Sequence, residues 1–290
     1  ISERKEGLIG LRIINQKTND SHFIDFGEDT YSSWISTNRE FNTNILRYGY
    51  TSMVTPNSTY DYDMEKRQKV LLKKQEVVGG YNEEEYHAET LYASSRDGEK
   101  IPISVVYKKA LRKNIPQNLL LYGYGAYGST ADPYFSSTRL SLLDRGFIFA
   151  IANVRGSQIY GRKSYDDGKL LNKKNTFYDF IDAGKFLIKE NYTNTNHLYC
   201  YGGSAGGLLI GAVINMEPSM WKGAIAGVPF VDAVTTMLDP TIPLTSNEWV
   251  EWGDPREKEY YDYILSYSPY DQVAQYKYPN LLVTAGFFDS

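Results

Sequence analysis

Cysteine, histidine and long apolar runs are all scarce in this sequence of 290 residues. Its one cysteine, Cys200, cannot form an intrachain disulfide, so the fold must depend on its hydrophobic core. This cysteine usage is compatible with a reducing compartment, and we expect a cytoplasmic protein. No apolar run approaches the roughly 20 residues that span a bilayer, so we expect no membrane span. The opening residues lack an initiator methionine and the pattern of a signal peptide, so we expect that the natural start is not included.

Basic charge is not in excess either. Lys and Arg number 31 and Asp and Glu number 35, which gives a net charge of -4. Such a balance supplies no broad positive field for phosphate groups, so we expect no nucleic-acid partner. The apolar content of 42% and charged content of 23% are ordinary for a soluble globular protein.

Two different patterns divide the chain between residues 77 and 78. The first part, residues 1–77, shows no helical period and holds short β-rich runs at 8–14, 21–26, 44–53, 58–64 and 69–74. Their spacing of roughly ten residues predicts an antiparallel meander. So few strands make a marginal unit alone, which suggests the last part of a repeating β architecture such as a β-propeller.

The second part, residues 78–290, alternates strands and helices after a predicted hairpin at Asp97-Gly98. Apolar runs predict strands at 118–125, 147–154, 197–203, 223–228 and 280–286, and helices at 135–146, 175–191 and 205–216. This alternation predicts an α/β fold, with a mostly parallel sheet covered by helices on both faces. Catalytic groups in such folds lie at the carboxyl ends of the strands.

Ser204 lies at such a strand end. The stretch from Gly202 to Gly206 matches G-x-S-x-G, with a strand directly before it and a helix directly after it. A sharp strand-to-helix turn strains the serine backbone and leaves room only for small neighbours. It also leaves the Ala205 amide at a helix N-terminus, where it can donate to a developing oxyanion. The motif predicts that Ser204 is a nucleophile; the alternative is a Gly-Ser turn that caps an ordinary helix.

A second oxyanion donor should come from another loop at the same sheet edge. The loop that follows the strand 118–125 offers Tyr124, whose alternative interpretation is a packed aromatic among 26 tyrosines. The same loop matches G-x-G-x-x-G, which raises the possibility of a dinucleotide site. We reject that site because Ala131-Asp132-Pro133 breaks the helix that should begin there, and because no acidic residue ends the next strand.

Asp289 ends a strand-like run downstream of Ser204. Its position suits the orienting acid in the order Ser, Asp, His that this fold class uses, although a loop aspartate without catalytic duty is the alternative. The three histidines, His22, His87 and His197, all precede Ser204. None should come within the roughly 2.6 to 3.2 Å that proton transfer requires, so we expect each to be structural.

Five stretches of the second part resemble one family of enzymes. The stretches YGGSAGGLLIGAVIN, GVPFVDAVTTMLDPTIPLT, EWGDP, SYSPYDQV and LLVTAGFFDS are similar to the oligopeptidase B branch of the prolyl oligopeptidase family of serine peptidases. The resemblance runs over residues 76–290 and more loosely over the preceding strands. It implies an α/β-hydrolase domain over residues 78–290, incomplete after the catalytic acid, and the last strands of a β-propeller over residues 1–77.

The resemblance also implies roles for individual residues. It makes Ser204 the nucleophile, Asp289 the acid, and the Tyr124 hydroxyl and Ala205 amide the oxyanion donors. The family's histidine follows the acid on a loop that these residues do not contain. We therefore expect little or no hydrolysis by residues 1–290 alone, because a serine without its base is a poor nucleophile.

Substrate preference is implied in the same way. The family pattern makes Glu248 the partner of an arginine or lysine side chain, with Phe230 as an aromatic wall. A solvated helix acid is the alternative for Glu248. Val250 stands where related enzymes often carry a second glutamate, although Glu251 is nearby. The stretch RGSQIYG, residues 155–161, also departs from the family, which commonly has a glycine run there.

The predicted function is cleavage of short peptides after Arg or Lys through an acyl-enzyme on Ser204. No metal or organic cofactor is expected, because no Cys/His cluster could bind zinc. A prolyl oligopeptidase or an esterase of the same fold is one alternative. A catalytically inactive interaction module is another. The oligomeric state is not predicted.

Overall fold

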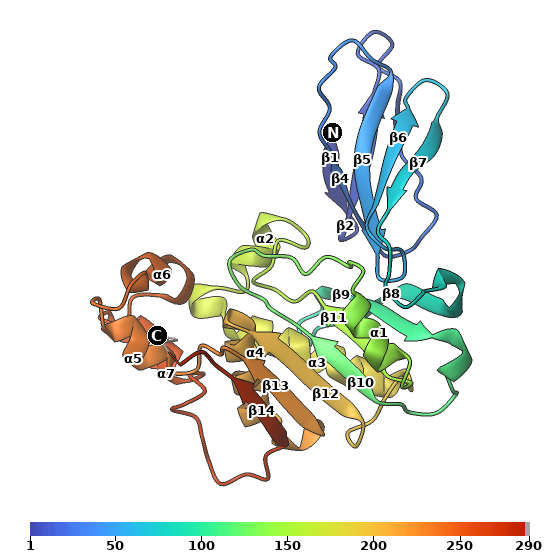
Figure 1. The fold of residues 1–290 in the computed structure, drawn as a ribbon. Coiled ribbons are helices and arrows are strands. Elements are labelled where there is room, and N and C mark those ends of the chain that lie inside the picture. Colours follow the sequence, from blue (N-terminus) through green and yellow to red (C-terminus); the bar gives the residue numbers. More distant parts are fainter. Residues whose placement is uncertain (288–290) are drawn as a thin grey trace. The chain divides into compact units, whose positions relative to one another are not determined.

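The computed structural model describes residues 1–287, which divide into two compact units (Figure 1). The first unit comprises residues 1–90, 104–112 and 132–146, and the second comprises the remaining residues. The domain limits that we placed at residues 77 and 78 stay a prediction.

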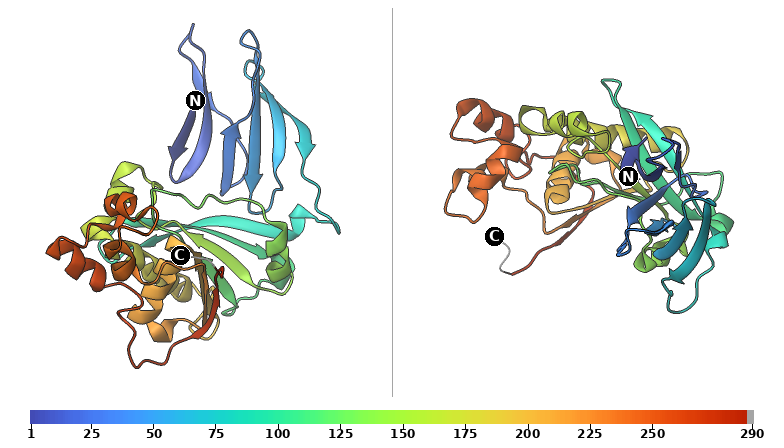
Figure 2. Two further views of the ribbon diagram at one scale, coloured as in Figure 1. Left: turned by 60° about the vertical axis from the view of Figure 1, so that its left-hand side comes forward. Right: turned by 90° about the horizontal axis from the view of Figure 1, so that it is seen from above.

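The first unit contains two antiparallel sheets, which lie side by side in Figure 2. The three-stranded sheet has the order β1-β2-β3 and the four-stranded sheet the order β4-β5-β6-β7. The strands are β1 (Ser2–Lys5), β2 (Leu8–Ile14), β3 (Ser21–Phe23), β4 (Tyr31–Ile35), β5 (Ile45–Ser52), β6 (Ser58–Asp63) and β7 (Gln68–Lys74). The antiparallel meander is therefore confirmed. Our prediction missed β1 and β4, which are short and rich in polar residues.

Aromatic residues form the core of these two sheets. Leu11, Ile24, Tyr48, Tyr50 and Tyr62 make one buried cluster. On β5, Tyr48 and Tyr50 are two residues apart and both reach the core, as the period of a strand requires. Tyr62 also lies 2.9 Å from the imidazole of His22, which fits the structural role expected for that histidine.

A seven-stranded sheet has the order β14-β13-β12-β10-β11-β9-β8. Its strands are β8 (Tyr86–Ser94), β9 (Lys100–Lys108), β10 (Leu119–Tyr122), β11 (Ile148–Ala152), β12 (Leu198–Gly203), β13 (Gly223–Gly227) and β14 (Asn280–Thr284). The pairings from β11 through β10, β12 and β13 to β14 are all parallel. A turn at Gly98, with φ +91°, joins β8 to β9 and confirms the predicted hairpin.

Burial along this sheet follows the predicted pattern except at one edge. All five residues of β11 are buried, as expected for a strand covered on both faces. The residues of β14 are all exposed, because β14 is an edge strand among the described residues.

Helices connect these strands and pack on the sheet. They are α1 (Ser137–Leu143), α2 (Arg162–Asp166), α3 (Lys174–Lys189), α4 (Ala205–Met216), α5 (Ala233–Leu238), α6 (Thr245–Trp252) and α7 (Lys258–Leu265). Helix α4 packs on β12 and β13, and α3 packs on α4. The three helices α5, α6 and α7 gather at one end of the sheet (Figure 1). Within residues 1–287, no helix is both long enough and apolar enough to span a bilayer.

The predicted α/β-hydrolase architecture is confirmed by this sheet and its helices. The helices α1, α3 and α4 were predicted. The helices α2, α5, α6 and α7 were not predicted, and each has only five to eight residues, too few for a helical period to stand out.

A buried ion pair ties the end of β11 to α3 and to the β8–β9 turn. The Arg155 guanidinium lies 2.6 Å from Asp179 of α3 and 2.6 Å from Asp97. The hydrogen bond from Arg155 lowers the pKa of Asp97 to about 2. Arg155 begins the stretch that departs from the family's glycine run, so this departure lies next to a structural ion pair.

Substitution of Asp179 tests the weight of this ion pair. We expect Asp179→Ala to lower the free energy of unfolding by about 3 to 5 kcal/mol, because it leaves a buried guanidinium short of one partner. Asp182 on the same helix pairs with the more exposed Arg96, so Asp182→Ala should cost about 1 kcal/mol or less. Urea unfolding of both variants measures the difference, and equal costs would contradict the account.

Candidate active site

Ser204 forms a strained elbow between β12 and α4. It follows Gly203, the last residue of β12, and precedes Ala205, the first residue of α4. Its backbone has φ +57° and ψ -120°, a conformation that residues other than glycine rarely adopt. The residue is exposed, so its hydroxyl is accessible as a nucleophile requires.

The glycines around Ser204 are required by close backbone contacts. A Cβ atom on Gly202 would lie 2.2 Å from the carbonyl oxygen of Gly206. A Cβ atom on Gly206 would lie 2.8 Å from the carbonyl oxygen of Gly123 in the neighbouring loop. Small residues at these positions therefore allow both the turn and the approach of the loop that carries Tyr124.

Tyr124 and Ala205 both lie next to the serine. The Tyr124 phenol lies close enough to the Ser204 side chain to interact with it. Burial raises the pKa of Tyr124, against the effect of Ser204, so the phenol stays protonated and can donate. The Ala205 amide is the first of α4, where an N–H group has no intrahelical acceptor. Two groups that can donate a hydrogen bond thus lie next to Ser204.

Three neighbouring strands end together at this place. In the parallel register Gly203 pairs with Gly227, and Gly227 pairs with Thr284. The residues that follow these strand ends help to line a pocket of about 430 Å³, which includes Ser204, Val228 and Ala285. The pocket therefore opens at the carboxyl edge of the sheet, as predicted for this fold.

Glu248 of α6 faces this pocket and is not a solvated helix acid. One oxygen, Oε2, accepts hydrogen bonds from the Tyr127 hydroxyl at 2.7 Å and from Trp252 Nε1 at 3.0 Å. The ring of Phe230 also lines the pocket and lies 5.5 Å from the Trp252 ring, measured between centroids. Ser204, Ala205, Glu248 and Phe230 thus line one pocket, and Tyr124 lies next to Ser204. The roles given to these residues stay predictions.

Val250 and Glu251, two and three residues after Glu248, do not line this pocket. The side chain of Val250 is 70% exposed. Glu251 is 1% exposed, and its two carboxylate oxygens accept from the Tyr127 amide and the Tyr165 hydroxyl. Glu251 therefore does not substitute for the carboxylate that is absent at Val250.

The predicted acid Asp289 lies outside the described residues. Among the histidines, His197 precedes β12 at the end opposite to Ser204, and its Nδ1 lies 2.8 Å from Asn118 Oδ1. His22 and His87 belong to the first unit, where His87 packs against Tyr107.

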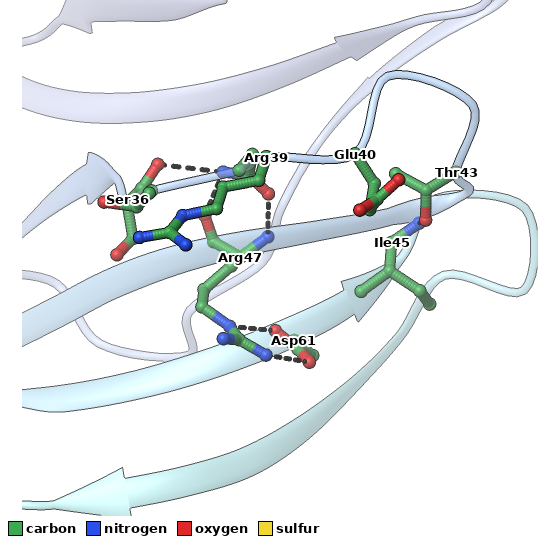
Figure 3. A pocket seen from close by; sticks show the side chains of 9 residues that line it. Ser36, Arg39, Glu40, Thr43, Ile45, Arg47 and Asp61 are labelled. Atoms are coloured by element: carbon green, nitrogen blue, oxygen red, sulfur yellow. Dashed lines mark hydrogen bonds and ion pairs between the residues drawn. The ribbon is translucent and has the colours of Figure 1, made fainter.

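A larger pocket of about 620 Å³ lies in the first unit, beside the loop between β4 and β5 (Figure 3). Its Arg47 is turned toward Asp61 and forms two hydrogen bonds of 2.8 Å with that carboxylate. The pocket is lined by charged and polar side chains without an activated nucleophile. Nor do residues 1–287 contain a group of three or more His, Cys, Asp or Glu side chains that could hold a metal ion. The serine pocket therefore remains the candidate active site.

Two sequence profiles match the chain, in agreement with its two architectures. The profile described as the N-terminal β-propeller domain of prolyl oligopeptidase matches residues 1–75, and that of the prolyl oligopeptidase family matches residues 133–290. The first profile covers the strands β1 to β7, and the second covers Ser204 and most of its pocket. The chain belongs to the prolyl oligopeptidase family.

Named relatives agree with this assignment. The chain is 49% identical to a dipeptidyl aminopeptidase BI of Pseudoxanthomonas mexicana and 43% identical to a protease 2 of Moraxella lacunata. Both alignments cover 100% of the chain but only 40% and 42% of those relatives. The solved structure of oligopeptidase B from Leishmania major matches 97% of the chain and 41% of its own, with a TM-score of 0.89 and 43% identity. The chain thus spans about two fifths of the length of these relatives.

Sequence reasoning missed Tyr127, Trp252, Tyr165 and Lys173, which surround the site from four different segments. The only local signal was the glycine loop around Tyr127, since flanking glycines indicate an unusual backbone. The other three are brought near the site by long-range packing.

Glycine and alanine at position 204 test the strain of the elbow. We expect Ser204→Gly to be more stable than Ser204→Ala by about 1 kcal/mol, because glycine adopts the observed φ without strain. At Ser246, an exposed residue of α6, the order should reverse, with glycine about 0.5 to 1 kcal/mol less stable than alanine. Thermal unfolding of the four variants measures both differences. Alanine more stable than glycine at both positions would show that the elbow is unstrained.

Proposed function

We propose that the natural protein that carries this sequence is a serine peptidase that cleaves peptides after Arg or Lys. The observation that carries the proposal is a carboxylate, Glu248, in the same pocket as an exposed serine on a strained elbow. The structural match to an oligopeptidase B supports a peptide as the substrate.

The reaction is acyl transfer through Ser204. Its Oγ attacks the scissile carbonyl carbon, the C–N bond breaks, and water then releases the acyl group. The Tyr124 hydroxyl and the Ala205 amide donate to the oxyanion, in a site where such donors typically contribute 10²- to 10³-fold each. Asp289 is our proposed orienting acid. Because the three histidines of this sequence lie elsewhere, the proposal places the general base outside these 290 residues.

The preference for a basic side chain follows from the way Glu248 is held. Its Oε2 is occupied by Tyr127 and Trp252, whereas Oε1 has no hydrogen-bond partner among residues 1–287. A carboxylate fixed by one oxygen and open at the other suits a guanidinium or ammonium group. The aromatic ring of Phe230 beside it can pack on the apolar stem of the same side chain. In a prolyl peptidase, the alternative of the same fold, an apolar ring would cover Oε1 of this carboxylate and leave it without a hydrogen-bond partner.

Covalent labelling tests the nucleophile. A fluorophosphonate should add to the natural protein at Ser204, with loss of fluoride, and peptide mapping should find the adduct on that residue. The Ser204→Ala variant should remain unlabelled. An intact protein that hydrolyses no peptide and never reacts at Ser204 would support the alternative of an inactive interaction module.

Neutralising Glu248 tests the substrate preference. We expect Glu248→Gln to lower kcat/KM for an arginyl anilide by about 10- to 100-fold, because a hydrogen bond to a charged group contributes about 1.5 to 3 kcal/mol. A neutral ester should be hydrolysed at nearly the wild-type rate. Glu259→Gln, at an exposed position of α7, is the control and should change neither rate. An equal loss on both substrates would refute the proposed role of Glu248.

A further inference from the structure

The backbone of the loop that follows β10 is left-handed at two positions, of which Tyr127 is strained and Gly125 is not. Gly125 has φ +74° and Tyr127 has φ +57°, both in the left-handed region. A bulky side chain rarely adopts this conformation, which costs about 1 to 3 kcal/mol. Ala126, between the two, is completely buried. Such a backbone persists only where its surroundings hold it in place.

Two buried charged side chains contact this loop. The ammonium group of Lys173, which is 1% exposed, donates to the carbonyl oxygens of Gly125 and Gly168. The carboxylate of Glu251, also 1% exposed, accepts from the Tyr127 amide at 2.8 Å. Lys173 thus contacts the peptide group between Gly125 and Ala126, and Glu251 contacts the peptide group between Ala126 and Tyr127.

Each of these charges is itself held in place. The second oxygen of Glu251 accepts from the hydroxyl of Tyr165 in α2. The Lys173 ammonium lies 5.1 Å from the centroid of the Trp252 ring. Burial lowers the pKa of Lys173 to about 8, and the negative charge of Glu251 opposes that shift. The charge of Glu251 therefore favours the ammonium form of Lys173, which donates to the loop.

The loop held in this way carries two phenols of the site. Tyr124 reaches Ser204, and Tyr127 reaches Glu248. The geometry points to Glu251 and Lys173 as a pair of positioning residues, which clamp residues 125–127 so that one phenol meets the nucleophile and the other meets the specificity carboxylate. The catalytic consequence of this clamp rests on the proposed function, but the clamp itself does not.

Hydrogen exchange tests the clamp without any requirement for activity. In the natural protein, Glu251→Met should speed exchange of the Tyr127 amide by at least about tenfold, because its acceptor is lost. The variant Lys173→Met, Glu251→Met removes both charges, so its thermal stability should recover in part relative to Glu251→Met. Its loop exchange should stay fast, since neither backbone contact is restored. Should Glu251→Met fail to fold, the doubly substituted variant carries the test. Wild-type exchange at Tyr127 in either folded variant overturns the inference.

Kinetics separate positioning from substrate recognition. Glu251→Met should lower kcat at least about tenfold for both an arginyl anilide and a neutral ester, because Tyr124 serves any acyl group. Glu248→Gln, by contrast, should slow hydrolysis of the arginyl anilide but not of the neutral ester. Glu259→Gln should again match the wild type on both substrates. A loss confined to KM for the arginyl substrate would overturn the positioning role. If the wild type hydrolyses neither substrate, the proposed function fails, whereas the exchange rates still decide the clamp.

Discussion

The close approach of two backbone segments at one edge of the sheet is the constraint on which the site depends. The turn at Ser204 leaves room only for glycine at position 202, where a Cβ atom would meet the Gly206 carbonyl. The loop that carries Tyr124 comes so close that position 206 also requires glycine. Because the backbones approach so closely, the Ser204 hydroxyl, the Ala205 amide and the Tyr124 phenol lie together without long side chains to connect them. The strain of this arrangement is compensated by the surrounding packed sheet and α4.

The charged side chains of this region differ in their surroundings. Glu248 lines the pocket together with Phe230, and its Oε1 makes no hydrogen bond among residues 1–287. Glu251 and Lys173 are buried. Their charged groups contact the backbone of Gly125, Tyr127 and Gly168 and the hydroxyl of Tyr165. Glu248 and Glu251 are three residues apart on α6 and therefore neighbours on the helix surface. Both contact Tyr127, Glu248 through the phenol hydroxyl and Glu251 through the backbone amide.

The parts of the fold that could be predicted are those with local signals. The elbow follows from the glycines around Ser204, and the strands β10 to β13 follow from short apolar runs. Glu251 and Lys173 could not be found in this way, because each looks like a solvated charge in its own segment and becomes buried only when distant segments pack. Helix α6 was missed for a similar reason, since its residues face a pocket and a loop and show no single apolar stripe. The role of Glu248 came from family resemblance, and its orientation required the structure.

The most direct measurement is a crystal structure of the natural protein after reaction with an arginyl phosphonate. The account predicts phosphorus bonded to Ser204 Oγ, a phosphonyl oxygen between the Tyr124 hydroxyl and the Ala205 amide, and the guanidinium at Glu248. A guanidinium bound away from Glu248, or a phosphonyl oxygen that meets neither donor, would contradict it.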